Sequence, residues 1–187
     1  MNTIIVRTAT EDDAVFAEMI AAEMEASAIA RGSGISKRSP SSLIRKMKEG
    51  KAIIAVTTAH QWAGFSYVEI WSNGEFVSNS GLIVAPVYRG NGVARQIKQK
   101  VFELARRLYP NAKVFSITTG LAIMKMNAEL GFAPVTFNEL PHDRAFWKGC
   151  KSCVNYSILT GKKCGNCLCT AMLYEPNPAV QQLKEIS

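Results

Sequence analysis

The spacing of apolar residues near the start of the chain predicts a strand followed by two helices. Ile4 and Val6 indicate a strand that ends at Thr10, where a hydroxyl followed by three acids is typical of a helix start. The next apolar residues recur at helical steps, and they are Phe16, Met19, Ile20, Met24 and Ala28. Ser39-Pro40 then begins a short second helix that ends at Gly50.

From Lys51 onward the hydrophobic period becomes that of strands. Three successive antiparallel strands are predicted at 52–56, 62–71 and 76–84, with Asn73-Gly74 as a hairpin turn. A longer amphipathic helix follows, with its apolar residues on one face and its cations mostly on other faces. The later predicted elements are this helix at 92–108, a strand at 114–118, a helix at 121–130 and strands at 132–137 and 169–174.

The composition is that of one globular domain with a C-terminal appendage. The chain has 187 residues, of which 48% are hydrophobic, enough for one buried core. No apolar run approaches the roughly 20 residues needed to span a bilayer, and the N-terminus lacks the pattern of a signal peptide. We therefore expect a soluble, cytoplasmic protein with no membrane partner. The net charge of +7 fits nucleic acid, an anionic surface or an anionic cofactor equally.

A glycine-rich turn, Arg89-Gly90-Asn91-Gly92-Val93-Ala94, joins a predicted strand directly to the amphipathic helix. Two glycines and free N–H groups at the positive end of a helix meet the physical requirement for holding a pyrophosphate. A dinucleotide-binding turn needs Gly-x-Gly-x-x-Gly in a parallel unit, a P-loop needs Gly-Lys-Ser/Thr, and neither pattern is present. The other interpretation is a tight turn that only caps the helix.

This turn resembles the cofactor signature Gln/Arg-x-x-Gly-x-Gly/Ala of the GNAT superfamily of acyl-CoA-dependent N-acetyltransferases, since Arg89, Gly92 and Ala94 match it. Leu130-Gly131-Phe132 is similar to a later family signature, and the order of elements matches over residues 3–137. The resemblance implies a GNAT-like α/β (α+β) fold, a mixed, mostly antiparallel sheet flanked by helices. It also implies that acetyl-CoA is bound by Leu82, Ile83, Val84, Arg89, Gly90, Asn91, Gly92, Val93 and Ala94.

The resemblance further implies direct attack of an amine on the thioester, with an acid that protonates the leaving thiolate. The family places a tyrosine acid four residues before the glycine of Leu-Gly-Phe, but this chain has Asn127 there. Asn127 either hydrogen-bonds the cofactor arm or packs the helix. Glu69 is the candidate base, or a solvated glutamate at a strand end, and Asn79 and Ser80 are candidates to hold a water that relays the proton.

The acceptor is expected at the loop between the first two helices, residues 31–38. Its cations Arg31, Lys37 and Arg38 suit a carboxylated acceptor, because arginine grips a carboxylate with two hydrogen bonds. The alternative is an exposed loop without a ligand. With Asn79-Ser80-Gly81-Leu82, Thr118-Thr119-Gly120-Leu121 and Phe146-Trp147-Lys148-Gly149-Cys150, the loop is similar to short bacterial acetyltransferases of arginine biosynthesis. That resemblance implies glutamate as acceptor and N-acetylglutamate as product.

Five cysteines lie close together near the C-terminus: Cys150, Cys153, Cys164, Cys167 and Cys169. Two Cys-x-x-Cys pairs are suited to a structural zinc ion, with Cys169 as a replacement for Cys164, and reduced thiols without metal are the equal alternative. We accordingly divide the chain into a GNAT-like core at 1–140, final strands with a cysteine-rich hairpin at 141–174 in the same domain, and a tail at 175–187.

Three other functions compete with amino-acid acetylation. The same fold could modify amines of proteins or peptides, or it could bind CoA without catalysis. A non-enzymatic zinc ribbon that binds nucleic acid is the third, but the positive charges are scattered rather than gathered near the cysteines. The expected partners are thus acetyl-CoA and a small amine, in particular an amino acid, and a homo-oligomer stays open.

Overall fold

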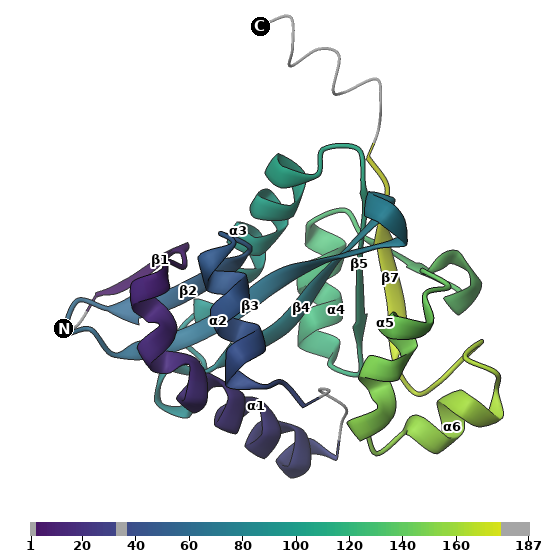
Figure 1. Cartoon of the computed structure of the whole chain (residues 1–187), viewed down its shortest axis with the longest axis horizontal. Helices are drawn as coiled ribbons and strands as arrows, with labels where there is room; N and C mark the ends of the chain where they lie inside the picture. The colour runs from purple at the N-terminus through teal and green to yellow at the C-terminus, as the bar shows by residue number, and fades with distance from the viewer. Residues whose placement is uncertain (1–2, 33–36, 177–187) are drawn as a thin grey trace, which may run out of the picture.

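The computed structural model describes residues 3–32 and 37–176, which form one mixed sheet with helices on both faces (Figure 1). The sheet has seven strands in the order β1-β2-β3-β4-β5-β7-β6. Neighbouring strands run antiparallel except β4 and β5, which are parallel. The strands are β1 (Ile4–Thr8), β2 (Ala52–Thr57), β3 (Trp62–Trp71), β4 (Phe76–Val84), β5 (Lys113–Thr118), β6 (Ala133–Val135) and β7 (Thr170–Tyr174).

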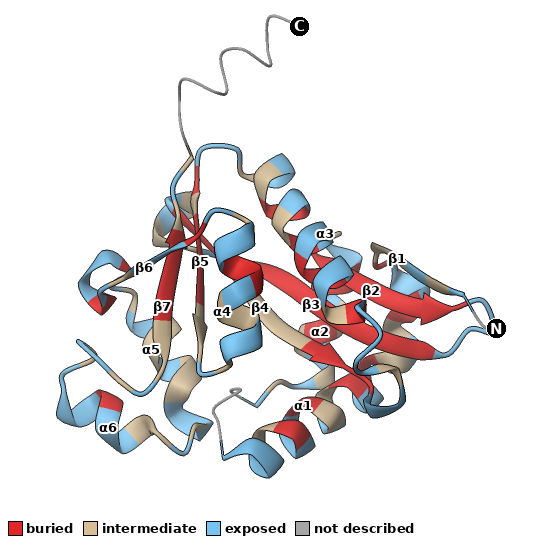
Figure 2. Ribbon diagram, turned by 180° about the vertical axis from the view of Figure 1, so that it is seen from behind, coloured by how far each residue is buried: buried red, intermediate tan, exposed pale blue. Residues whose placement is uncertain are grey.

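Helices cover both faces of the sheet. Helices α1 (Ala17–Arg31) and α2 (Pro40–Lys48) lie on one face, and α3 (Val93–Leu108) and α4 (Leu121–Glu129) lie on the other (Figures 1 and 2). Short helices α5 (Arg144–Lys148) and α6 (Tyr156–Gly161) lie beside β5 and β7. The 3-10 helices are η1 (Glu11–Phe16), η2 (Ser72–Gly74), η3 (Pro86–Tyr88), η4 (Phe137–Glu139) and η5 (Gly149–Ser152).

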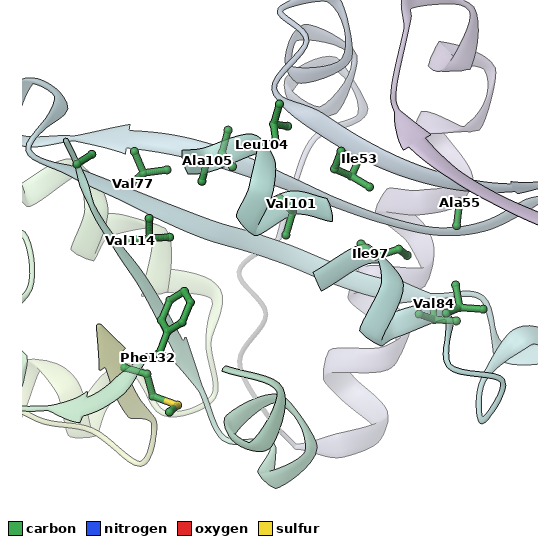
Figure 3. Close-up of a cluster of buried hydrophobic side chains, with 14 of the residues drawn as sticks. Ile53, Ala55, Val77, Val84, Ile97, Val101, Leu104, Ala105, Val114 and Phe132 are labelled. Atoms are coloured by element: carbon green, nitrogen blue, oxygen red, sulfur yellow. The ribbon is translucent and has the colours of Figure 1, made fainter. Parts of the chain in front are cut away.

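The strand period divides the core into layers on the two faces of the sheet. Along β2, Ile53 and Ala55 pack under α3, whereas Ile54 and Val56 pack under α1 and α2. Figure 3 shows the α3 layer, in which Ile97 lies near Val84 at one end of the helix. Because helices cover both faces of the central strands, apolar residues can follow one another along these strands without alternating with polar residues.

Strands β4 and β5 separate soon after they pair. Their ladder contains only Phe76 with Lys113, Val77 with Val114 and Ser78 with Phe115. A shift in the register between β3 and β4 accompanies the separation. Gly81 lies at this shift with φ of 64°, and a Cβ there would lie 2.7 Å from a ring carbon of Tyr67. The irregular strand therefore requires glycine at this position and leaves a gap between β4 and β5.

Most predicted elements are confirmed within two residues, and the predicted mixed, mostly antiparallel α/β fold is confirmed. The strand expected at 132–137 is shorter, and Asn73 and Gly74 do form the turn between β3 and β4. The described residues contain no helix that is both long and apolar enough to cross a membrane. Residues 33–36 of the expected acceptor loop and most of the expected tail, 177–187, lie outside the described residues.

The cysteine-rich segment differs from the expected hairpin of strands. The connection between β6 and β7 forms α5, η5 and α6 instead, and only β7 of the expected final strands lies within 141–174. Its aromatic residues explain the difference. Phe146 and Trp147 pack in a third apolar cluster, where Phe146 contacts Phe115 of β5 and Trp147 stacks on Phe137 of η4.

Candidate active site at the gap between β4 and β5

The glycine-rich turn lies at the N-terminus of α3 and leaves its backbone N–H groups open. Gly90 and Gly92 have φ of 80° and 75°, and no atom lies within 4 Å of a Cβ built on either glycine. The first helical hydrogen bond is donated by Gln96 to the carbonyl of Gly92. No described residue accepts a hydrogen bond from the N–H groups of residues 90–95. The turn can therefore bind a phosphate through several N–H groups at the positive end of the helix.

The side chain of Arg89 holds this turn in place rather than pointing away from the protein. Its Nε donates to the carbonyl of Val84 at 3.1 Å. Its Nη2 donates to Oε1 of Glu23 at 2.6 Å and to Oγ of Ser27 at 2.8 Å, and both residues belong to α1. Arg89 thus fixes the turn against β4 and α1, and its role toward a cofactor stays a prediction.

Two cavities meet at the gap between β4 and β5. One, of about 170 Å³, lies toward α3 and α4, and we call it the α3-side cavity. The other, of about 160 Å³, lies toward α5 and α6. Both are lined by Asn79 and Gly81 from β4 and by Ser116 and Ile117 from β5. A ligand that lies between the separated strands would reach both cavities.

Polar groups of β4 line this gap without complete hydrogen bonding. Both the Nδ2 and the Oδ1 of Asn79 are buried and have no partner among the described residues. Such unpaired groups are costly unless a ligand or water satisfies them. The Oγ of Ser80 lies 2.9 Å from the Oγ of Ser78, which accepts a hydrogen bond from Nε1 of Trp71. Asn79 and Ser80, the candidates to hold a relaying water, thus both line the gap.

A third cavity, of about 170 Å³, lies between α2, β3 and η5, and we call it the α2-side cavity. Arg38, Arg45 and Lys46 supply three cations to its lining, and Glu69 supplies the one acid. The Nζ of Lys46 lies 2.6 Å from Oε1 of Glu69. The excess of positive charge favours an anionic ligand.

Tyr67 also lines the α2-side cavity and was missed by the sequence analysis. Its hydroxyl accepts a hydrogen bond from Nε of Arg38, and burial raises the pKa of the phenol. The signal was present, because Tyr67 and Glu69 share a face of β3 through the strand period. Lys46 was not predicted as a site residue either. It lies between Arg45 and Lys48 in α2, and the sequence does not indicate which of these cations is buried.

The three cations of the predicted acceptor loop do not come together. Arg38 lines the α2-side cavity, whereas Arg31 lines the α3-side cavity and donates from Nε to the carbonyl of Ser27. Lys37 forms an exposed ion pair with Glu25 at 2.9 Å. Arg31 at the end of α1 and Arg38 just before α2 therefore line cavities on different sides of the sheet. Only Arg38 of the three lines the α2-side cavity.

Lys98 of α3 is buried, which corrects the expectation that the cations of this helix lie away from its apolar face. Its residue is 3% exposed and lines the α3-side cavity, with Nζ 5.2 Å from the centre of the Phe132 ring. Burial lowers the pKa of its amine to about 7. Lys98 follows Ile97 at the edge of the apolar face of α3. Whether a residue at this edge is buried depends on the elements that pack against it, which the sequence of the helix does not show.

Asn127 of α4 is completely buried, and it faces β7 rather than either cavity at the gap. Its Nδ2 donates to Sδ of Met172 at 3.5 Å, and its Oδ1 has no partner among the described residues. Asn127 is absent from the linings of both cavities. Of its two expected roles, this position agrees with packing of the helix.

Four of the five cysteines line the cavity toward α5 and α6: Cys150, Cys153, Cys167 and Cys169. Cys164 lines a different cavity. Burial, followed by the neighbouring thiols, raises the pKa of Cys150 to about 11 and raises that of Cys169 further. In the part of the chain that the structure describes, no three His, Cys, Asp or Glu side chains are placed to share a metal ion. A zinc ion held by these thiols thus stays a prediction from their spacing.

No protein-family model and no curated protein matches this chain. Solved structures do match it in fold. A Neisseria gonorrhoeae N-acetylglutamate synthase, complexed with coenzyme A and N-acetyl-glutamate, aligns with 94% of this chain at 16% identity and a TM-score of 0.64. This chain covers only 35% of the length of that synthase.

Two shorter proteins match along nearly their whole lengths. A Mycobacterium tuberculosis protein in complex with CoA aligns with 91% of this chain and 98% of its own, at 16% identity and a TM-score of 0.62. A GNAT-family acetyltransferase of Listeria monocytogenes aligns with 92% of this chain and 94% of its own, at 12% identity and a TM-score of 0.60. At these identities the similarity shows a shared fold.

Proposed function

We propose that this chain, which has the fold of GNAT-family acetyltransferases, transfers the acetyl group of acetyl-CoA to the amine of a small carboxylated acceptor. Glutamate is the first acceptor to test. The observation that carries the proposal is the gap between β4 and β5, which connects a cavity on each face of the sheet. The co-crystallised CoA of the structural neighbours supports acetyl-CoA as the donor.

The binding of acetyl-CoA is assigned to the turn and to the free edge of β4. Backbone N–H groups from Gly90 to Ala94 would hold the pyrophosphate, because they point out of a helix N-terminus without partners. Beyond Ser78, β4 has no ladder partner in β5, so the backbone of Leu82, Ile83 and Val84 can hydrogen-bond the extended arm of the cofactor. The unpaired amide of Asn79 is placed to bind the end of that arm or a water beside it.

The acceptor is assigned to the α2-side cavity. Arg38, Arg45 and Lys46 exceed the one acid there, Glu69, by two positive charges. A dicarboxylic amino acid carries two carboxylates and one amine, so its charges complement such a lining. Glutamate as acceptor is further supported by the synthase among the structural neighbours, which was crystallised with N-acetyl-glutamate.

Proton removal from the amine is assigned to Glu69, with Asn79 and Ser80 holding a relaying water. The Nζ of Lys46, 2.6 Å from Oε1 of Glu69, holds this carboxylate in the lining of the α2-side cavity, where it can accept a proton from the acceptor through a water. The hydroxyl of Ser80 lines the α2-side cavity together with Glu69 and also lines the cavity at the gap. It therefore connects the acceptor side to the reacting centre.

The experiment is the release of free CoA from acetyl-CoA, followed over a panel of amines. Glutamate is compared with glutamine, which lacks the side-chain charge, with polyamines and with peptides. Turnover that requires both carboxylates supports the proposal. Turnover with peptides alone would move the acceptor class to proteins, and turnover with no amine while acetyl-CoA binds would leave a CoA-binding protein without catalysis.

A further inference from the structure

We propose that Lys98 is the proton donor to the sulfur of CoA when the acetyl group leaves it, an inference that rests on the proposed function. The family's tyrosine acid is replaced by Asn127, whose amide does not supply a proton and which lies outside the cavities at the gap. The reaction still needs a proton on the leaving sulfur. The α3-side cavity contains one group suited to give it.

Lys98 lies at the level of β4 where the chain bulges. Helix α3 begins just after β4 ends and runs back along it, with Ile97 near Val84 (Figure 3). The cavity that Lys98 lines is also lined by Asn79, Gly81 and Leu82 of β4 and by residues 116–118 of β5. The lysine therefore faces the gap in which the thioester is proposed to lie.

The surroundings of Lys98 leave its amine without a counter-ion. Arg31 from α1 is the one other titratable side chain in the lining of the α3-side cavity. The strands and α4 contribute hydroxyl, amide and apolar groups there, and Phe132 contributes a ring face. No described residue forms an ion pair with Lys98, and a buried lysine without an acid loses its proton readily. Its pKa of about 7 lets the amine give and regain a proton at neutral pH.

The other polar groups of this cavity are unsuited to the role. Arg31 does not release a proton near neutral pH. Serine and threonine hydroxyls, which Ser116, Thr118 and Thr119 contribute, are far weaker acids than an ammonium group. Lys98 is thus the one group in this lining whose proton is available and whose loss of charge is favoured by its burial.

The step balances without a further reactant. The acceptor nitrogen bonds to the carbonyl carbon, the bond from that carbon to sulfur breaks, and its electron pair stays on sulfur. Lys98 Nζ gives its proton to the sulfur and becomes a neutral amine. The proton that the acceptor nitrogen has released returns through water to Lys98. The products are the acetylated amine and CoA with a free thiol.

The activity test uses Lys98→Met and Lys98→Arg, with Lys100→Met as the matched control. Lys100 lies on the same helix but is exposed. We expect kcat to fall by about 100-fold in both Lys98 variants, because a positioned acid contributes about 10²-fold or more, while the control stays unchanged. Lys98→Arg keeps the charge but holds its proton, so full activity in that variant would overturn a proton-donor role.

A second readout does not depend on turnover. CoA is bound to each variant, and the thiolate is titrated by its ultraviolet absorbance, with CoA lacking the sulfur as the blank. At pH 6, where Lys98 is mostly protonated, its ammonium beside the sulfur should raise the fraction of bound CoA that is thiolate about tenfold relative to Lys98→Met. Equal thiolate fractions in these two proteins at this pH would overturn the inference. Failure of wild-type protein to bind CoA would instead overturn the proposed function.

Discussion

Two lysines are buried on opposite faces of the sheet, and they differ in what surrounds their amino groups. Lys46 on α2 is 7% exposed and its Nζ lies 2.6 Å from Glu69. Lys98 on α3 is 3% exposed, forms no ion pair with a described residue, and has its Nζ 5.2 Å from the centre of the Phe132 ring. A buried ammonium keeps its charge beside a carboxylate and loses it without one. The α2 side therefore carries an ion pair, whereas the α3 side favours exchange of a proton.

The largest effect on stability is expected from Lys46→Met, which removes the positive partner of the buried ion pair. This change leaves Glu69 as a largely buried carboxylate without its ion-pair partner, so we expect a loss of about 3 kcal/mol of folding free energy at pH 8. Chemical denaturation measures it. Glu69→Gln with Lys46→Met in the same chain is the control, since removal of both charges should recover much of the loss. No loss in the single variant would mean that the pair contributes nothing.

Lys98→Met is expected to act in the opposite direction. Methionine fills a similar volume without an amine to desolvate, so we expect the free energy of unfolding at pH 7 to rise by about 2 kcal/mol. Lys100→Met, exposed on the same helix, should change it by less than about 0.5 kcal/mol. Destabilisation by Lys98→Met would show that the amine has a favourable partner in the folded protein.

The free energy of unfolding should also depend on pH differently in the wild-type protein and in Lys98→Met. The pKa of Lys98 is about 7 in the folded protein, against about 10.4 in an unfolded chain. Between these values the unfolded chain holds a proton that the folded protein lacks. The contribution of Lys98 to the free energy of unfolding therefore increases as the pH rises from about 7 toward 10, by at most about 1.4 kcal/mol per pH unit. The folded protein becomes more stable over this range.

Denaturation at several pH values between 7 and 10 measures this slope, and the difference between wild type and Lys98→Met isolates it. Cys150, whose pKa is raised to about 11, titrates late in the folded state of both proteins and cancels in the difference. Parallel curves for the two proteins would show that Lys98 keeps its ordinary pKa.

Smaller effects on KM should distinguish the α2-side cavity, proposed for glutamate, from the α3-side cavity, proposed for acetyl-CoA. Arg38→Gln should raise the KM for glutamate about tenfold and leave the KM for acetyl-CoA unchanged, because Arg38 lines the α2-side cavity. Arg31→Gln should raise the KM for acetyl-CoA more than that for glutamate, because Arg31 lines the α3-side cavity. Steady-state kinetics with each substrate varied in turn measures both. Equal changes in both KM values for either variant would contradict this division.

The smallest effect is expected at Lys37. Its ion pair with Glu25 is exposed on both sides, so Lys37→Ala should change the free energy of unfolding by less than about 0.5 kcal/mol. The KM for glutamate should also stay unchanged if Arg38 is the cation of this loop that meets the acceptor. A large rise in that KM would return Lys37 to the acceptor site.

The positions of the strands and of the glycine-rich turn were predictable because each depends on neighbours in the chain. The two-residue period located β2, β3 and β4, and Gly90 and Gly92 marked the turn that needs positive φ. The place of Asn79 on β4 was predictable in the same way, but the gap beside it was not. The residues proposed to bind the acceptor and to protonate the sulfur were less predictable, since they lie on different elements.

Closeness in sequence predicted less about two sets of side chains. Arg31 and Arg38 are close in sequence, but Arg31 ends α1 and Arg38 precedes α2, and they line different cavities. Four of the cysteines line one cavity and Cys164 lines another, although Cys164 packs against the same apolar cluster as Cys150, Cys167 and Cys169. Closeness along the chain does not determine which side of a sheet a side chain reaches.

By itself the sequence determined the order of elements, the alternating faces of the strands and the open turn at the start of α3. These depend on local steric limits and on hydrophobic periods, which act over a few residues. Only the tertiary structure decided that β4 and β5 separate after Ser78, that Lys46 pairs with Glu69 and that Lys98 has no acid partner among the described residues. The physical reason is that the burial and the charge state of a side chain depend on the segments that pack around it.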